Sequence, residues 1–210
     1  MIRILIADDH AIVRAGLKQI IEGIPDMMLA DEASNGRELM EKVRRKDYDV
    51  IVLDITMPGG GGIEVLNQLK NEKPKLPVLA LSIHPEEQYG KRMLKAGASG
   101  YLTKESAPEE LVTAIRRVFE GRRYVSSTLA ERLAADLATP ADKPLHEELS
   151  DREYQVMLLI GSGKMLTEIA SDLNLSVKTV STYRSRILEK MKMKSNAELT
   201  YYVIKHRLVD

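Results

Sequence analysis

The chain has 210 residues, enough for one large domain or two small ones. Basic and acidic residues each number 31, so the net charge points to no class of partner. The absence of cysteine excludes a disulfide framework and a thiolate metal site, and four scattered histidines disfavour a zinc cluster. Charges begin at Arg3 and no apolar run approaches the ~20 residues of a membrane span, so we expect a cytoplasmic protein without a signal peptide.

Residues 1–120 alternate short apolar runs with amphipathic stretches, which is typical of repeated βα units. Units of this kind fit an α/β fold of the flavodoxin-like, doubly wound class, with five parallel strands in the order 2-1-3-4-5. The expected strands lie near 3–7, 28–33, 49–54, 77–82 and 99–102, and the expected helices near 11–23, 35–46, 62–72, 86–95 and 107–120.

The first and the last of these helices carry apolar stripes at the spacing of a core-facing helix. We expect both stripes to be buried, with an interface as the alternative for Phe119. The stripes consist of Ile12, Val13, Leu17, Ile20 and Ile21 in the first helix, and of Leu111, Val112, Ile115, Val118 and Phe119 in the last.

Polar residues end most of the expected strands. Asp54 follows four consecutive apolar residues, a run typical of a buried strand in a parallel sheet. Asp8 and Asp9 end the first strand, Ser82 ends the fourth and Lys104 ends the fifth. The carboxyl ends of parallel strands form the crevice where open α/β sheets bind ligands, whereas a charge buried in a core is costly. These side chains are therefore the candidate functional site.

The loop 58–62, a proline followed by four glycines, invites comparison with a phosphate-binding P-loop. It lacks the lysine and the hydroxyl residue of that motif, and it follows an acidic strand end. We favour a flexible turn beside Asp54, in which glycine supplies unusual φ angles.

The composition changes after Gly121. A short helix with regularly spaced leucines is expected over 127–137, and the prolines within 139–144 then break any helix and indicate a linker. The sequence predicts three parts, which are the α/β domain over 1–120, a linker with a short helix over 121–147 and a smaller all-α domain over 148–210.

The all-α part opens with a capping box of Ser150 and Glu153. Its segment 176–207 contains eight basic and two acidic residues, so we expect this segment to contact a polyanion. Four helices are expected, the first ended by Gly161 and Gly163, the others running from Thr167 to Leu173, from Val177 to about Met191 and from about Asn196 to Arg207.

The third of these helices has one apolar and one polar face. Val180, Ile187 and Met191 lie on the apolar face. On an isolated helix the polar face would simply be solvated. The compact helix and turn before it instead favour a helix-turn-helix, whose second helix enters the major groove of DNA. The polar face presents Lys178, Ser181, Thr182, Ser185 and Arg186.

Two resemblances to known families follow from these residues. The set Asp8/Asp9, Asp54, Thr56-Met57-Pro58, Ser82 and Lys104 resembles the receiver domain of bacterial two-component response regulators, over about the first 120 residues. The pattern Leu149-Ser150-x-Arg152-Glu153…Gly163…Glu168-Ile169-Ala170…Leu175-Ser176…Lys178-Thr179-Val180 resembles the LuxR-type helix-turn-helix.

A receiver joined to this module resembles the NarL/FixJ family. The tail looks most like its GacA-type branch, through Tyr183-Arg184 and Glu198-Leu199-Thr200. Met165-Leu166-Thr167 departs from the family, so the DNA-backbone contacts that this turn makes in the family are not carried over.

The receiver resemblance implies that Asp54 accepts a phosphoryl group from a sensor histidine kinase or a phosphotransfer protein. It implies a Mg²⁺ ion bound by Asp9, Asp54 and the backbone carbonyl of Thr56, with Asp8 acting through water. We expect no enzymatic activity beyond phosphorylation and dephosphorylation of Asp54 itself.

The same resemblance implies a switch. Lys104 would pair with a phosphoryl oxygen, and Ser82 would donate a hydrogen bond to the phosphoryl group. Tyr101 would change rotamer together with Ser82, which would transmit the local change in charge.

The helix-turn-helix resemblance implies binding to double-stranded DNA at promoters, as a homodimer that forms on phosphorylation. Ala197, Tyr201, Ile204 and Leu208 recur at three- or four-residue spacing and are expected to form the dimer contact, with core packing as the alternative. We expect base contacts from Ser181, Thr182 and Ser185, and phosphate contacts from Lys178, Thr179 and Arg186. Lys190, Lys192 and Lys194 would join the phosphate contacts if the end of the helix lies along the DNA backbone.

Two other functions remain open. An aspartate-nucleophile phosphatase has the same class of sheet but an Asp-x-Asp motif, whereas position 56 here is Thr, which disfavours turnover of outside phosphoesters. A DNA-binding protein whose receiver serves only for dimerisation is the other alternative, and the intact set of acids argues against it.

Overall fold

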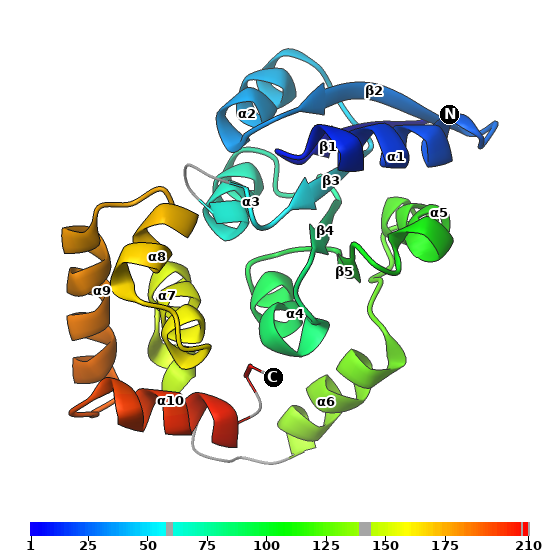
Figure 1. Cartoon of the computed structure of the whole chain (residues 1–210). Helices are drawn as coiled ribbons and strands as arrows, with labels where there is room; N and C mark the ends of the chain where they lie inside the picture. Colours follow the sequence, from blue (N-terminus) through cyan, green and yellow to red (C-terminus); the bar gives the residue numbers. More distant parts are fainter. Residues whose placement is uncertain (58–60, 139–143, 207, 210) are drawn as a thin grey trace. The chain divides into compact units, whose positions relative to one another are not determined.

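The computed structural model describes residues 1–57, 61–138, 144–206 and 208–209. The chain divides into two compact units, Met1–Leu137 and Ala138–Asp210 (Figure 1). Within the described ranges, no helix has both the length and the apolar character that a membrane span requires.

The first unit is a parallel five-stranded sheet in the order β2-β1-β3-β4-β5, so the predicted doubly wound fold is confirmed. Its elements lie close to the expected limits. The strands are β1 (Ile2–Ala7), β2 (Met27–Ala33), β3 (Val50–Asp54), β4 (Val78–Ser82) and β5 (Gly100–Thr103), and the helices are α1 (Ala11–Glu22), α2 (Gly36–Arg45), α3 (Gly61–Glu72), α4 (Glu86–Lys95) and α5 (Ala107–Phe119).

Helices cover both faces of this sheet, with α1 and α5 on one face and α2, α3 and α4 on the other (Figure 1). The core against α1 and α5 includes Ile4, Val52, Leu17 and Ile115. Because β3 is central and covered on both sides, every residue of β3 is buried and its apolar run is continuous. The first polar side chain of that run, Asp54, therefore sits at the carboxyl edge of the sheet.

The expected apolar stripes of α1 and α5 are partly wrong. Ile12 is 84% exposed. It lies about 100° round the helix from Val13, and therefore outside the buried face of α1, which contains Leu17 and Ile21. Phe119 is 48% exposed and lines an open cavity of about 590 Å³ with Tyr48. The cavity residues precede β3 and β4 and follow α5, so this cavity is at the opposite edge of the sheet from Asp54.

The segment after α5 adds a short bridge to the free edge of β5. The Tyr124 N–H donates to Ser99 O at 3.0 Å, and the Tyr101 N–H donates to Tyr124 O at 3.0 Å. In the next helix, α6 (Ser127–Ala138), Leu129 is 3% exposed and lies against Gly90 of α4. The predicted linker therefore begins with a stretch that packs on the first unit, and residues 139–143 of its proline-containing part lie outside the described residues.

Gly100 makes this attachment sensitive to substitution. A Cβ at Gly100 would lie 2.7 Å from Tyr124 O, so Gly100→Ala should push the segment off β5 and cost about 1–3 kcal/mol of stability. Hydrogen exchange of the Tyr101 amide should accelerate. Gly16→Ala is the control, since a Cβ at Gly16 of α1 meets nothing within 4 Å. Equal exchange at Tyr101 in both variants would contradict the proposed bridge.

The second unit is all-helical, as expected, with one additional short 3₁₀ helix, η1 (Leu145–Glu148). The other helices are α7 (Asp151–Gly161), α8 (Leu166–Asp172), α9 (Val177–Lys190) and α10 (Asn196–Lys205). Their core contains fully buried apolar side chains from all four α-helices, namely Val156, Met157, Ile169, Val180, Ile187, Leu199 and Val203.

The predicted capping box at the start of α7 is confirmed and extends further than expected. Ser150 Oγ accepts from the Glu153 N–H at 3.3 Å, and the Ser150 N–H donates to Glu153 Oε2 at 2.8 Å. Lys190 Nζ of α9 also donates to Glu153 Oε2, at 2.6 Å. Burial works to raise the pKa of Glu153, but Lys190 and Ser150 outweigh it and the pKa is lowered. Glu153 therefore stays charged and ties the end of α9 to the start of α7.

Candidate functional site

The carboxyl edge of the sheet gathers the polar residues that the sequence singled out. Asp8 follows β1, Asp54 ends β3 and Ser82 ends β4, and all three are 0% exposed. Lys104 follows β5 directly, and its side chain is 13% exposed. Parallel strands place their carboxyl ends at one edge, so residues distant in the sequence meet here.

The Lys104 ammonium group joins two of these acids. Its Nζ lies 2.8 Å from Asp54 Oδ2 and 2.7 Å from Asp8 Oδ2. Burial works to lower the pKa of Lys104, but the hydrogen bonds to Asp54 and Asp8 outweigh it and the pKa is raised. Lys104 is therefore a fixed positive charge between two buried carboxylates.

Both carboxylate oxygens of Asp54 have partners. Oδ1 accepts from the Thr56 N–H at 2.8 Å and from Thr56 Oγ1 at 2.6 Å, while Oδ2 accepts from Lys104. This pattern orients the side chain and covers it.

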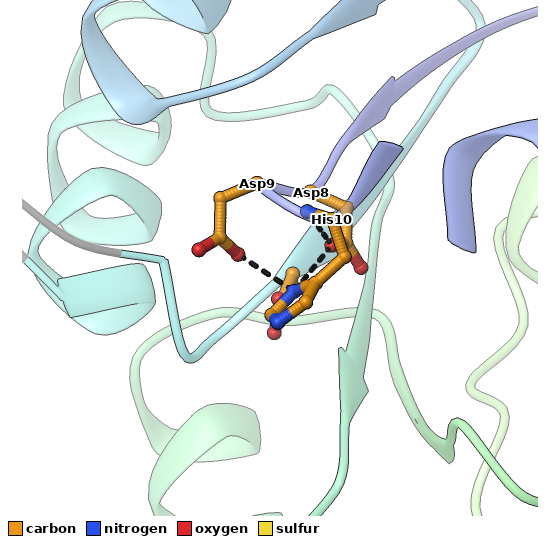
Figure 2. Close-up of side chains that lie close together, drawn as sticks. Asp8, Asp9 and His10 are labelled. Carbon is orange, nitrogen blue, oxygen red and sulfur yellow. Dashed lines mark hydrogen bonds and ion pairs between the residues drawn. The ribbon is translucent and has the colours of Figure 1, made fainter. Parts of the chain in front are cut away.

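A second group of ligand atoms lies at the start of α1, where Asp8, Asp9 and His10 point toward one another (Figure 2). Oxygens of Asp8, Asp9 and Asp54 and a nitrogen of His10 all lie within 4.8 Å of one another. Among the residues described, Asp9 Oδ1 is buried without a hydrogen-bond partner, whereas the buried Asp8 Oδ2 is paired with the Lys104 ammonium group at 2.7 Å. Carboxylate oxygens in this arrangement suit a hard divalent cation such as Mg²⁺.

Sequence reasoning missed His10 and His84. His10 is the N-cap residue of α1 and makes no capping bond with its side chain, and its place directly after the acid pair was the available signal. His84 connects the two expected switch residues through its backbone. Its N–H donates to Ser82 Oγ at 2.9 Å, and its carbonyl accepts from Tyr101 Oη at 2.8 Å. Tyr101 is buried, and its hydroxyl is bonded to the same residue of the loop as the Ser82 hydroxyl.

The glycine-rich loop falls partly outside the described residues, at 58–60. At the end of the loop, the Gly62 N–H donates to Ile55 O at 3.0 Å. A Cβ at Gly62 would lie 2.2 Å from Ile55 Cα, so close backbone approach requires glycine at this position.

The second unit contains the expected helix-turn-helix. The turn between α8 and α9 closes with a bond from the Leu175 N–H to Ala170 O at 2.8 Å, and Asn174 has a φ of 52°. Ser176 Oγ accepts from the Thr179 N–H at 3.0 Å and caps α9. The Thr179 hydroxyl, a predicted phosphate contact, is bonded to Ser176 Oγ at 2.8 Å.

The two faces of α9 are as expected. Val180, Ile187 and Met191 are buried. Two of the hydroxyls on the polar face donate to backbone carbonyls of their own helix, Thr182 to Lys178 at 2.9 Å and Ser185 to Ser181 at 3.1 Å. In these rotamers each oxygen is left as an acceptor. The exposed residues of this face are Lys178, Thr182, Ser185 and Arg186, while Thr179 and Ser181 are half-buried.

The expected dimer contact of α10 is only partly exposed. Tyr201 is 68% exposed, Ile204 is 57% exposed and Ala197 is exposed as well. Leu208 is 7% exposed, so its inclusion was wrong. Its N–H donates to Val203 O at 3.0 Å, which turns the chain back after α10 and buries the side chain.

Comparison with known families agrees with both units. Residues 4–116 match the response regulator receiver domain, and residues 147–203 match the bacterial regulatory proteins of the luxR family. The sheet, its acidic edge and the helix-turn-helix thus define a two-component response regulator with a receiver and a LuxR-type DNA-binding domain. The chain belongs to the NarL/FixJ family of response regulators.

Relatives match over the full chain, and the expected likeness to the GacA-type branch is confirmed. Response regulator UvrY of Escherichia coli K12 is 39% identical over 212 residues, covering 100% of this chain and 97% of UvrY. Response regulator GacA of Pseudomonas protegens is 39% identical over 210 residues, covering 100% of this chain and 99% of GacA.

Solved structures of RcsB are similar to the whole chain. RcsB from Salmonella enterica serovar Typhimurium, bound to promoter rprA in the presence of the phosphomimetic BeF₃⁻, is 27% identical with a TM-score of 0.66, covering 97% of this chain and 99% of that one. Another structure of Salmonella typhimurium RcsB is 26% identical with a TM-score of 0.69, covering 98% of each chain.

Proposed function

We propose that this response regulator accepts a phosphoryl group on Asp54 from a sensor histidine kinase or a phosphotransfer protein and, in response, binds promoter DNA through α9 in the bacterial cytoplasm. The observation that carries the proposal is the pairing of buried Asp54 with Lys104, in a chain that also presents an exposed basic helix-turn-helix face. RcsB, which is similar over the whole chain, has been solved on promoter DNA with a phosphomimetic.

Each residue of the site would have a separate role in phosphoryl acceptance. Asp54 Oδ2 is the nucleophilic atom, and Thr56 holds the carboxylate through Oδ1. Lys104, released from Asp54, pairs with a phosphoryl oxygen as a point charge. Asp9, Asp54 and the Thr56 carbonyl would hold Mg²⁺, with Asp8 acting through water. The ion would supply positive charge that offsets repulsion between the acids and the phosphoryl group.

Phosphorylation of Asp54 would act on the loop after β4 through hydrogen bonds. Ser82 Oγ accepts from the His84 N–H, and a hydrogen bond from this hydroxyl to a phosphoryl oxygen would pull on the loop. Because Tyr101 Oη is bonded to His84 O, the same movement would release the buried tyrosine. Tyr101 is also bonded through its N–H to Tyr124, so the movement would reach the segment that leads out of the first unit.

We infer that the protein acts chemically only on its own Asp54. The neighbour of Asp54 that a phosphatase would use as general acid is Thr56, whose hydroxyl donates to Asp54 instead. A receiver kept only for dimerisation would have no need for Lys104 buried between Asp8 and Asp54.

Selection of binding sites from random DNA tests the proposal. The full chain is incubated with a random duplex library, with and without acetyl phosphate and Mg²⁺. We expect enrichment of a defined sequence, and more of it when the phosphoryl donor is present. A library that stays random under both conditions would rule out sequence-specific DNA binding.

We expect specificity and general affinity to reside in different residues of α9. Lys178→Ala should weaken binding to every sequence alike and lower the salt slope by about one unit. Thr182→Ala should cost roughly 1–3 kcal/mol on the selected site alone, at the lower end because a short hydroxyl reads bases partly through water. Since Thr182 donates to its own helix, it is expected to accept from an adenine or cytosine amino group.

The affinities of both variants for selected and scrambled duplexes are measured in a salt titration. Equal weakening of both duplexes by Thr182→Ala, together with an altered preference in Lys178→Ala, would reverse the two roles.

We propose that α10 forms the dimer contact on DNA, through the exposed side chains of Ala197, Tyr201 and Ile204. Tyr201→Ser with Ile204→Ser should abolish cooperative occupancy of paired half-sites in sedimentation, while single half-sites still bind. Ile12→Ser is the control, because Ile12 is also a large exposed apolar residue, at 84%, but lies on α1. Unchanged cooperativity in the double variant would place the contact elsewhere.

A further inference from the structure

We propose that His10 is a metal ligand and that the ion site of this receiver contains one nitrogen among its oxygens. Such a site favours first-row transition ions such as Mn²⁺ and Ni²⁺ over Mg²⁺, compared with an all-oxygen site. The inference deepens the proposed function, since it rests on a divalent cation at Asp9 and Asp54.

The distances around the imidazole fit a shared ion. His10 Nδ1 lies 3.1 Å from Asp8 Oδ1 and 3.0 Å from Asp9 Oδ1. Ligands at right angles around an octahedral ion, each at about 2.1 Å, are separated by about 3.0 Å. Asp54 belongs to the same group of atoms, which spans no more than 4.8 Å. The nitrogen thus occupies the place of a neighbouring ligand in the set (Figure 2).

Hydrogen bonding within the cluster leaves part of it unsatisfied. His10 Nδ1 and the His10 N–H both lie within hydrogen-bond distance of one oxygen, Asp8 Oδ1. Asp9 Oδ1 is buried without a hydrogen-bond partner in the part of the chain that the structure describes, despite its 3.0 Å approach to the imidazole nitrogen. A buried carboxylate oxygen without a donor is costly, and a cation between these atoms would satisfy it.

Among the residues that are described, the His10 side chain contacts the two acids, Asp8 and Asp9. As N-cap of α1 it makes no capping bond with its side chain, which is 57% exposed and reachable by an ion from solvent. Imidazole is a good ligand for Ni²⁺, whereas Mg²⁺ prefers oxygen and keeps its waters. Replacing His10 should therefore lower the affinity for Ni²⁺ more than the affinity for Mg²⁺.

Pulsed electron paramagnetic resonance of the Mn²⁺-loaded full chain tests the ligand directly. We expect the ¹⁴N coupling of a directly coordinated imidazole in the unmodified protein and its loss in His10→Ala. His206→Ala, an exposed histidine of α10's C-terminal end, is the control and should retain the coupling. Mn²⁺ bound without nitrogen coupling, or coupling that persists in His10→Ala, would overturn the inference.

Titrations with Ni²⁺ and Mg²⁺ then measure the preference. His10→Ala should lower Ni²⁺ affinity by at least about tenfold and leave Mg²⁺ affinity nearly unchanged. Equal losses for both ions would mean that His10 only orients the carboxylates, which overturns the inference. Asp9→Asn separates this failure from a failure of the proposed function. If it leaves the binding of every ion unchanged, the acids are not the ion site at all.

Discussion

Asp54→Asn is expected to eliminate phosphorylation by acetyl phosphate in the presence of Mg²⁺. The reaction forms a bond from Asp54 Oδ2 to phosphorus and breaks the bond from phosphorus to the departing acetate. An amide in place of the carboxylate lacks the nucleophilic oxygen. Intact-protein mass spectrometry should show an adduct on the unmodified chain and none on the variant.

Asp26→Asn is the matched control, because Asp26 is an exposed acid paired with Arg116 at 2.9 Å, on a different edge of the sheet. It should be phosphorylated like the unmodified protein. The competing acceptor is Asp9, whose side chain is 29% exposed whereas that of Asp54 is 0% exposed. An adduct that persists in Asp54→Asn and maps to Asp9 would show that accessibility, and not the pairing with Lys104, selects the acceptor.

Lys104→Ala is expected to have the second largest effect, on stability as well as on phosphoryl acceptance. Removing the ammonium leaves Asp8 and Asp54 buried with no cation from the described residues at either Oδ2, which should cost about 3 kcal/mol of unfolding free energy without a divalent ion. Added Mg²⁺ should restore part of this loss, because it supplies positive charge at the same carboxylates. Urea unfolding with and without Mg²⁺ measures both effects.

The pH dependence of the same variant has a defined sign. The pKa of Lys104 is raised above 10.5 in the folded chain, so its contribution is fully present below pH 10.5 and is lost as pH rises through the higher folded value. In Lys104→Ala, this decrease in stability at alkaline pH should be absent. Lys18→Ala is the control, since Lys18 forms an exposed pair with Glu22 at 3.8 Å and should change stability by less than about 1 kcal/mol. Similar losses in the two variants would contradict a buried pairing at the site.

Much of the fold follows from local pattern, because each strand of a covered parallel sheet is a short continuous apolar run. The run before Asp54 indicated both the central strand and the edge at which the acid would lie. Ile12 and Leu208 were misassigned because both are apolar residues at the margin of a stripe. Whether such a residue is buried depends on the neighbouring elements, which spacing within one helix does not show.

The candidate site was predictable in its charged members and less so in its backbone and histidine contacts. Asp8, Asp54 and Lys104 could be associated because parallel strand ends converge. His84 acts through its N–H and carbonyl, which any residue except proline would offer, so no side-chain pattern marks it. The attachment of Tyr124 to β5 likewise depends on backbone groups and on the absence of a Cβ at Gly100.

The central claim is that phosphorylation of Asp54 controls binding to DNA, and one measurement tests it most directly. The affinity of the unmodified chain and of Asp54→Asn for the selected duplex is measured by fluorescence anisotropy, with Mg²⁺ and with or without acetyl phosphate. We expect the donor to raise the affinity of the unmodified chain by about fivefold or more and to leave Asp54→Asn unchanged. An equal rise in both proteins, or none in the unmodified chain despite complete phosphorylation, would contradict the account.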